Sequence, residues 1–332
     1  MMKRKYDIYG IGAALLDTEI TLKDADLAAM KVDKGVMTLV DEARQQELID
    51  YLQGHLVASH KASGGSAANT VIAASYFGCR NFFSCKVADD EHGRHYLSDI
   101  AAAGVSTPAA SKVQDGITGK CLVMITPDAE RTMNTFLGIS ATLSVEQLDE
   151  AAIADSEYVY IEGYLVTSET GKAAALRLHS LARQHHTKIA LSLSDPAMAT
   201  YFRDGLREMV GGGVDLIFCN QEEALAFTES SDLAAACQAL RSYTKQFVIT
   251  CGAHATIVFD GTTQHEVPAF PVTPLDTNGA GDMFAGAFMY AISQNHDFVR
   301  AASFANRAAA KVVSQYGPRL SAEEHAVLKQ AL

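Results

Sequence analysis

Short apolar runs rich in β-branched residues alternate with longer helical patterns over most of this 332-residue chain. Residues 7–11 and 188–192 have the character of buried strands, whereas residues 66–77 and 168–184 have that of helices. Such alternation predicts β-α-β units, and therefore an α/β fold with a mostly parallel sheet covered by helices. Ligands of such sheets bind at the carboxyl ends of the strands.

The remaining elements follow the same alternation. Further strands are expected at residues 82–87, 158–161, 216–219, 247–250 and 256–259. Further helices are expected at residues 42–52, 92–103, 233–241, 281–293 and 298–313.

Residues 15–40 and 112–137 break the pattern, because they consist of strands and turns with polar interruptions. The second stretch contains strand candidates at 121–125 and 131–136. We interpret the two stretches as parts of one small β lid that meet in space, and the alternative is edge strands of the main sheet. Since no repeat or flexible linker divides the chain, we expect a single domain over residues 1–332 with a discontinuous lid.

Composition and charge exclude several classes of protein. The net charge of −12 makes a nucleic-acid partner unfavourable. No apolar run approaches the length of a membrane span, and the start of the chain is too polar for a signal peptide. The six cysteines contain no C-x-x-C pair, so we expect buried thiols in a cytoplasmic protein.

The most specific motif is residues 276–282, which read Asp-Thr-Asn-Gly-Ala-Gly-Asp and precede a long apolar run. A helix that begins here would leave free backbone amides and a partial positive charge beside Gly279, Ala280 and Gly281, which suits an anion such as phosphate. Asp282 would then lie beside that phosphate, in a position to accept a proton from an attacking hydroxyl. The alternative is a glycine turn capped by an aspartate.

A second cluster of small residues, 63–70, precedes the helix predicted at 66–77. Gly64 and Gly65 would let a ligand approach the backbone, and Asn69 lies on the first helical turn. The alternative is an ordinary helix start that uses Ser66 as its N-cap.

Together the two clusters resemble the PfkB/ribokinase family of carbohydrate and nucleoside kinases, whose C-terminal motif reads Asp-Thr-x-Gly-Ala-Gly-Asp. The resemblance implies a ribokinase-like three-layer α/β/α sandwich with a small β lid. It implies that Asp282 is the catalytic base and that the Gly279–Gly281 amides form the anion hole. It also implies that the sugar or ribose is bound by Gly64, Gly65, Ser66 and Asn69.

The first strand leads into residues 10–17, which lack the third glycine and the helix of a dinucleotide-binding fingerprint, so we exclude an oxidoreductase. In the family this strand delivers an asparagine and then an aspartate to substrate hydroxyls. Asp17 matches the aspartate, whereas Ala13 stands where asparagine is usual.

Two further residues are expected near the acceptor. Arg131, in the lid, has planar donors that suit a phosphoryl group, and its alternative is a surface pair with Glu130 or Asp128. Tyr164, after a strand, either stacks on a purine or packs in the core.

The nucleotide side rests on weaker matches. Glu223, in the family's Asn-x-x-Glu motif, suits Mg²⁺ held through water, although Asn220 and its acidic neighbours also form an ordinary helix start. No Walker A motif is present. The resemblance implies contacts with ATP from Asn220, Thr250, Gly252, Asn278 and Asn306.

Residues 276–278, Arg131 with Asn134, and residues 162–165 are similar to adenosine kinases within the family. We therefore expect Mg²⁺-dependent transfer of the ATP γ-phosphoryl group to the 5′-hydroxyl of adenosine. Ala13 keeps a kinase of a free sugar such as ribose, fructose or a keto-sugar acid as the alternative, and a nucleotide-binding sensor is a third hypothesis. A requirement for a monovalent cation and the choice between monomer and homodimer stay open.

Overall fold

A large sheet forms the middle layer of the protein. The computed structural model describes residues 4–53, 60–113 and 115–332. The strand order is β15-β14-β13-β12-β11-β10-β1-β5; the strands from β13 to β5 are parallel, and β14 and β15 close one edge in antiparallel fashion. The strands are β1 (Tyr6–Ile11), β5 (Asn81–Ser84), β10 (Ser156–Glu162), β11 (Lys188–Ser192), β12 (Val214–Asn220), β13 (Thr244–Thr250), β14 (Thr256–Phe259) and β15 (Gln264–Val267).

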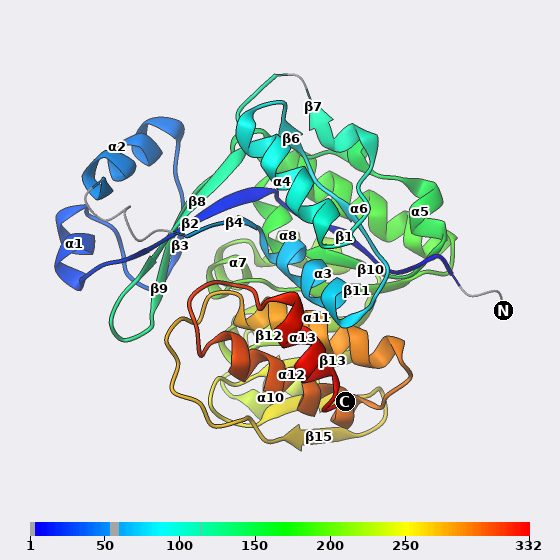
Figure 1. Ribbon diagram of the computed structural model, residues 1–332. Coiled ribbons are helices and arrows are strands. Elements are labelled where there is room, and N and C mark those ends of the chain that lie inside the picture. Colours follow the sequence, from blue (N-terminus) through cyan, green and yellow to red (C-terminus); the bar gives the residue numbers. More distant parts are fainter. Residues whose placement is uncertain (1–3, 54–59, 114) are drawn as a thin grey trace.

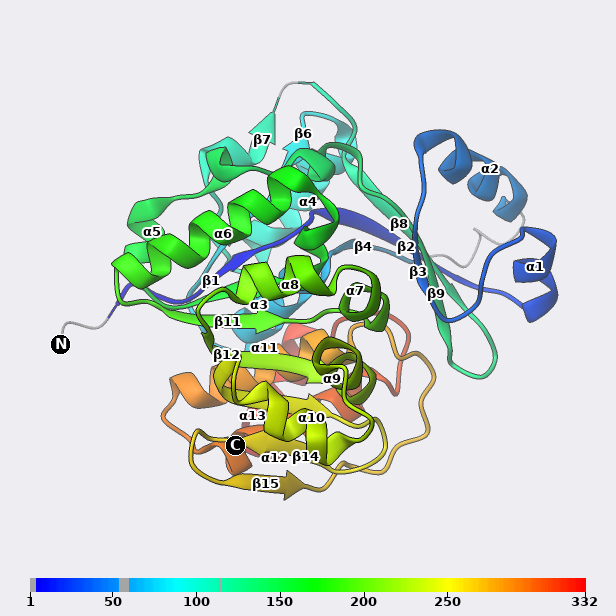
Figure 2. The same cartoon turned by 180° about the vertical axis from the view of Figure 1, so that it is seen from behind.

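Helices cover both faces of this sheet and create two separate cores (Figures 1 and 2). Along β1, Ile8 enters one core and Tyr9 the other, because successive side chains of a strand point to opposite faces. One face carries α3 (Ser66–Phe77), α4 (Glu91–Ala102), α11 (Ala280–Ser293), α12 (Phe298–Val312) and α13 (Ala322–Lys329). The other carries α5 (Glu150–Ala154), α6 (Glu169–Gln184), α7 (Pro196–Tyr201), α8 (Arg203–Val210), α9 (Gln221–Thr228) and α10 (Leu233–Leu240).

A second, smaller sheet forms the lid, which projects to one side of the main body together with α1 and α2 (Figure 1). Its order is β3-β9-β8-β2-β4. The elements are β2 (Leu15–Thr21), α1 (Asp24–Ala29), β3 (Met37–Leu39), α2 (Glu42–Leu52), β4 (His60–Gly64), β8 (Gly119–Ile125) and β9 (Arg131–Phe136).

The two faces of the lid sheet differ in what they meet. Leu122 and Met124 of β8 pack with Leu48 and Leu52 of α2. Cys121, Val123 and Ile125, which alternate with these two residues along β8, point to the opposite face. The lid therefore has a core of its own on one face, and the other is left to meet the main body.

The sequence stretches 15–40 and 112–137 do meet in one small sheet, but three details differ from the expectation. Residues 82–87 form two strands, since β5 ends at Ser84 and the chain then turns so that β6 (Val87–Ala88) pairs with β7 (Lys112–Val113). β7 consequently lies outside the lid sheet. The lid also includes β4 and the short helix α1, whose sequences show no clear hydrophobic periodicity. Residue 114, in the second stretch, lies outside the described residues.

Within the described parts of the chain, none of the helices combines the length and the apolar character needed to cross a membrane.

The separate lid core predicts local unfolding. Leu48→Ala should remove about 2–5 kcal/mol of packing from the lid alone, so hydrogen exchange should accelerate in β8 and β9 while β10–β13 keep their protection. Leu178→Ala, the same truncation in the main core at an equally buried position, is the matched control and should lower the Tm of the whole protein. An equal loss of protection in both sheets of the Leu48 variant would show that lid and body unfold together.

Candidate active site

A cavity of about 830 Å³ lies between the lid and the carboxyl ends of the main strands. Residues at or just after the ends of five parallel strands line it, namely Ala13, Glu162, Ser192, Asn220 and Thr250. This is the place where a parallel sheet is expected to bind ligands. Of the residues predicted for the site, all except Gly64 line this one cavity.

Two buried helices, α3 and α11, begin at the cavity and pack closely against each other. A Cβ at Gly286 of α11 would lie 2.6 Å from the carbonyl oxygen of Thr70 and 2.8 Å from the Cβ of Ala73. Because glycine removes that Cβ, the two helix backbones approach closely and their first turns face each other.

The loop before α11 is shaped for close contact. Gly279 has a φ of +72°, and a Cβ there would lie 2.6 Å from backbone atoms of Pro318, so only glycine fits. A Cβ at Gly281, by contrast, would meet nothing within 4 Å. Gly279, Ala280 and Gly281 line the cavity, so the positive end of α11 borders open space that an anion would occupy favourably.

Asp282 lies on the first turn of α11 and faces the first turn of α3. Ser66 Oγ donates a hydrogen bond to Asp282 Oδ1 at 2.6 Å, and Asn69 Nδ2 donates to Oδ2 at 3.2 Å. Burial raises the pKa of the Asp282 carboxyl, and these hydrogen bonds and the charges of Arg131 and Arg319 oppose the rise. The carboxylate keeps lone pairs with which to accept a proton.

Asp17 explains why residue 64 is glycine. A Cβ at Gly64 would lie 2.0 Å from Asp17 Oδ2, so the missing side chain makes room for a carboxylate of the protein itself. Asp17 is buried, and burial together with the nearby Glu19 raises its pKa to about 8. The ionised form of such a buried carboxylate is stabilised when a ligand hydroxyl donates a hydrogen bond to it.

Glu162 belongs to the site although the sequence motifs assigned it no role. Its carboxylate is buried and accepts hydrogen bonds from the backbone amides of Ala13 at 3.1 Å and Ala67 at 2.8 Å. Burial raises the pKa of Glu162 to about 7. It therefore connects the loop after β1 to the first turn of α3. The hints in the sequence were its position as the last residue of β10 and its place in the 162–165 string.

Arg131 reaches from the lid to the loop before α11. Its Nη1 donates to the carbonyl oxygen of Thr277 at 3.4 Å, and Thr277 Oγ1 donates to the carbonyl oxygen of Ala129 at 3.3 Å. Asp128, which the sequence offered as a surface partner for Arg131, is instead bound by Lys34 at 2.6 Å.

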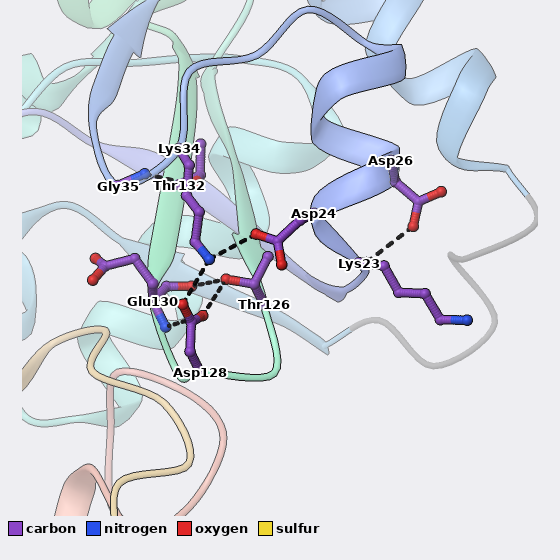
Figure 3. Close-up of polar contacts among 9 residues, drawn as sticks. All are labelled: Lys23, Asp24, Asp26, Lys34, Gly35, Thr126, Asp128, Glu130 and Thr132. Atoms are coloured by element: carbon purple, nitrogen blue, oxygen red, sulfur yellow. Dashed lines mark hydrogen bonds and ion pairs between the residues drawn. The ribbon is translucent and has the colours of Figure 1, made fainter.

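Figure 3 shows how this part of the lid is fixed. Lys34 Nζ also pairs with Asp24 at 2.7 Å, and Thr126 Oγ1 donates to Asp128 Oδ1 at 2.7 Å. The backbone amide of Gly35 donates to Thr132 Oγ1 at 3.0 Å. These contacts connect the segment between α1 and β3 to the β8–β9 turn, from which Arg131 projects.

The lid wall of the cavity contains a group of apolar side chains, namely Leu15, Met37, Leu39, Met133 and Leu137. Asp17, Glu130, Arg131 and Thr135 of the lid also line the cavity. Tyr164, in the 3-10 turn after β10, packs against a core of the main body, as one of its two predicted roles requires, and it also lines the cavity.

The end of the cavity that the sequence predicts to bind the nucleotide contains Asn220, Glu223, Thr250 and Gly252. Glu223 is buried, and its carboxylate accepts from the backbone amide of Asn220 at 3.0 Å and from Asn220 Nδ2 at 2.8 Å. Burial raises the pKa of Glu223 to about 8. Asn220 also caps α9, so the helix-start alternative holds alongside the place in the cavity.

Two predicted ATP contacts use their side chains within the protein. Asn278 Nδ2 donates to Glu19 Oε1 at 3.2 Å. Asn306 is buried rather than surface-facing; its oxygen accepts from Thr256 Oγ1 at 2.8 Å and its Nδ2 donates to the carbonyl oxygens of Val267 and Pro268. Both line the cavity, where they support its wall.

Comparison with known proteins fits this geometry. The model of the pfkB family carbohydrate kinases matches residues 30–325. The chain belongs to this family. It is therefore a phosphotransferase with an alcohol group as acceptor, and the family implies the use of ATP and Mg²⁺.

The relatives of this pfkB-family kinase include more than one activity. The adenosine kinase of Sinorhizobium meliloti is 31% identical, with a TM-score of 0.92 and coverage of 99% of this chain and 100% of that one. A probable sugar kinase of Rhizobium etli is 29% identical, with a TM-score of 0.93 and coverage of 99% of both chains. The adenosine kinase of Saccharomyces cerevisiae is 27% identical over 95% of this chain and 96% of its own.

The residues at the end of the cavity predicted to bind ATP suit a nucleotide that carries Mg²⁺. Among the described residues, no three His, Cys, Asp or Glu side chains gather closely enough to hold a metal ion by themselves. Mg²⁺ commonly keeps several waters and binds substrate phosphates with few protein groups. Glu223, whose oxygens already accept hydrogen bonds from Asn220, suits a contact through water.

The contact between Gly64 and Asp17 predicts a selective binding defect. In Gly64→Ala the new Cβ must displace the Asp17 carboxylate, so the KM for the alcohol acceptor should rise about tenfold or more, corresponding to a lost or unpaired hydrogen bond of ~1–3 kcal/mol. The KM for ATP should not change. Gly212→Ala, where a Cβ would meet nothing within 4 Å, is the control. An unchanged acceptor KM in Gly64→Ala would exclude Asp17 from acceptor binding.

Proposed function

We propose that this kinase transfers the γ-phosphoryl group of ATP to the 5′-hydroxyl of adenosine. The observation that carries the proposal is the presence of polar and apolar surfaces in one cavity. Asn69 and Asp282 of the body and Asp17 of the lid strand β2 offer hydrogen-bonding groups, and the lid also offers the apolar side chains of Leu15, Met37, Leu39, Met133 and Leu137.

A nucleoside matches both surfaces at once. Its ribose hydroxyls can donate to the buried Asp17 carboxylate, and its base presents flat apolar area to the lid wall and to Tyr164. Each 100 Å² of apolar area removed from water contributes roughly 2.5 kcal/mol, and stacking of a base on an aromatic ring contributes about 1–3 kcal/mol where it has been measured. A free pentose would cover the polar groups only.

The similarity to adenosine kinases over nearly the whole chain supports the same substrate. A free sugar is the second candidate, and two observations favour it. Ala13 offers a methyl group where the family has an asparagine amide, and its backbone amide is already bonded to Glu162. The probable sugar kinase of Rhizobium etli is as similar in structure as the adenosine kinase of Sinorhizobium.

Each residue has a defined part in the proposed reaction. The oxygen of the 5′-hydroxyl forms a bond to the γ-phosphorus, the bond from that phosphorus to the β,γ-bridging oxygen breaks, and the hydroxyl proton passes to Asp282. Ser66 and Asn69 hold the accepting carboxylate in place. Arg131 and the start of α11 stabilise negative charge on the transferred group. Bound Mg²⁺ would supply further neutralisation of the phosphates.

A comparison of acceptors tests the proposal. ADP release with Mg²⁺ and ATP is measured with adenosine, other nucleosides, ribose, fructose and 2-keto-3-deoxygluconate. Adenosine should be turned over selectively. In Asp282→Asn, kcat should fall by about 100- to 10,000-fold because the proton acceptor is lost, while ATP binding is retained. Turnover of a free sugar alone would refute the nucleoside assignment, and full activity of the variant would refute the base.

A further inference from the structure

A largely buried arginine lies behind the proposed acceptor site, outside the set of residues that line the cavity. Arg319 follows α12, and only 15% of its side chain is exposed. Its Nε donates to Asn69 Oδ1 at 3.1 Å, and its Nη1 donates to Asp99 Oδ2 of α4 at 2.8 Å. Its Nη2 is buried and has no hydrogen-bond partner among the described residues. Removing a cation from water costs free energy that a single ion pair offsets only in part, so we expect Arg319 to have a function at this position.

The chain places Arg319 there through the loop before α11. The backbone amide of Gly317 donates to Asp276 Oδ2 at 3.0 Å. Pro318 lies against Gly279, where a Cβ would come within 2.6 Å of it. The segment that carries Arg319 is therefore fastened to the same loop that ends in Asp282.

We propose that Arg319 is a positioning residue for phosphoryl transfer, which fixes the amide of Asn69 so that Asn69 Nδ2 donates to Asp282. The guanidinium has only donors, so it must face the oxygen of the amide. A carboxylate has only acceptors, so Asp282 must face the nitrogen. The reversed amide would place a donor against a donor and an acceptor against an acceptor, and the pair therefore imposes one orientation. This inference rests on the role of Asp282 as the base in the proposed function.

The charge of Arg319 adds an electrostatic effect. Burial raises the pKa of Asp282, and Arg319 is one of two cations that lower it. Arg319 also lowers the pKa of Asp17, where burial and Glu19 act in the opposite direction. The titratable and charged groups that face Asp282 are Asp17, Arg131, Tyr160, Glu162, Tyr164 and Arg319. Since only the ionised carboxylate accepts the proton, Arg319 should extend activity to lower pH.

Two substitutions separate the charge from the hydrogen bond. Arg319→Gln removes the charge but keeps an N–H donor, so the acid limb of the kcat–pH profile should move up by about 0.5–1 unit. At a pH below that limb, kcat would be roughly three- to tenfold lower. Arg319→Lys keeps the charge but loses the planar donors, so the limb should stay in place while the plateau of kcat falls. Arg94→Gln, which removes an exposed arginine paired with Asp89, is the control and should alter neither.

A double-mutant cycle with Asn69→Ala tests the route of the effect. If Arg319 acts through the Asn69 amide, the plateau losses of Arg319→Lys and Asn69→Ala will not add, because the second change removes a contact already lost. A uniform loss at every pH, matched by a loss of folded protein in thermal melts, would show a structural role only and overturn the proposal. Additive plateau losses would likewise overturn the positioning role.

A measurement without turnover keeps this proposal separate from the proposed function. The carboxyl carbons of ¹³C-labelled aspartates are titrated by NMR in the wild-type protein and in Arg319→Gln, and Asp282→Asn assigns the signal. The Asp282 titration should move to higher pH in Arg319→Gln whichever acceptor the enzyme uses. An unchanged titration would overturn the electrostatic part, whereas failure to turn over adenosine would count against the substrate assignment alone.

Discussion

The contact between α3 and α11 is the interaction on which the rest of the site depends. Because Gly286 lets the two helices approach at Thr70 and Ala73, their first turns arrive at the same point. One turn then brings Ser66 and Asn69, and the other brings Asp282, although the two helices lie more than 200 residues apart in sequence. A wider separation of the helices would leave the partly buried Asp282 carboxylate without these donors, which is costly. The packing of these two helices therefore also fixes the geometry of the site.

The elements that the sequence predicted best are those whose information is local. The helices at 42–52 and 66–77 and the strand at 188–192 were predicted with the bounds they have. Residues 276–282 combine glycines with small neighbours and precede a long apolar run, and each of these features has a direct physical meaning. Edge strands and short helices such as β15 and α1 carry few apolar residues and no sustained period, so the sequence alone did not reveal them.

Long-range contacts account for what sequence reasoning missed in the site. Arg319 meets Asn69 across 250 residues, and Glu162 meets the amides of Ala13 and Ala67 from a strand end with no motif of its own. Gly64 was predicted to let a ligand approach the backbone, whereas the atom next to the missing side chain is an Asp17 oxygen. Such contacts depend on how distant loops pack, and one sequence contains no record of that packing.

Buried carboxyl groups in and around the cavity predict that a bound substrate stabilises the folded protein. Asp17, Glu19, Glu162 and Glu223 are buried carboxyls whose pKa values burial raises to about 7 or 8. Near neutral pH, ionising any of them costs free energy that the protein alone offsets only in part. Acceptor hydroxyls that donate to Asp17 reduce this cost, and they are available only when a ligand is bound. Binding should therefore stabilise the folded enzyme through Asp17, the carboxylate that we propose recognises the acceptor. The polar groups of the cavity would suit any furanose, so under the proposed function the apolar side chains of the lid wall would select a nucleoside.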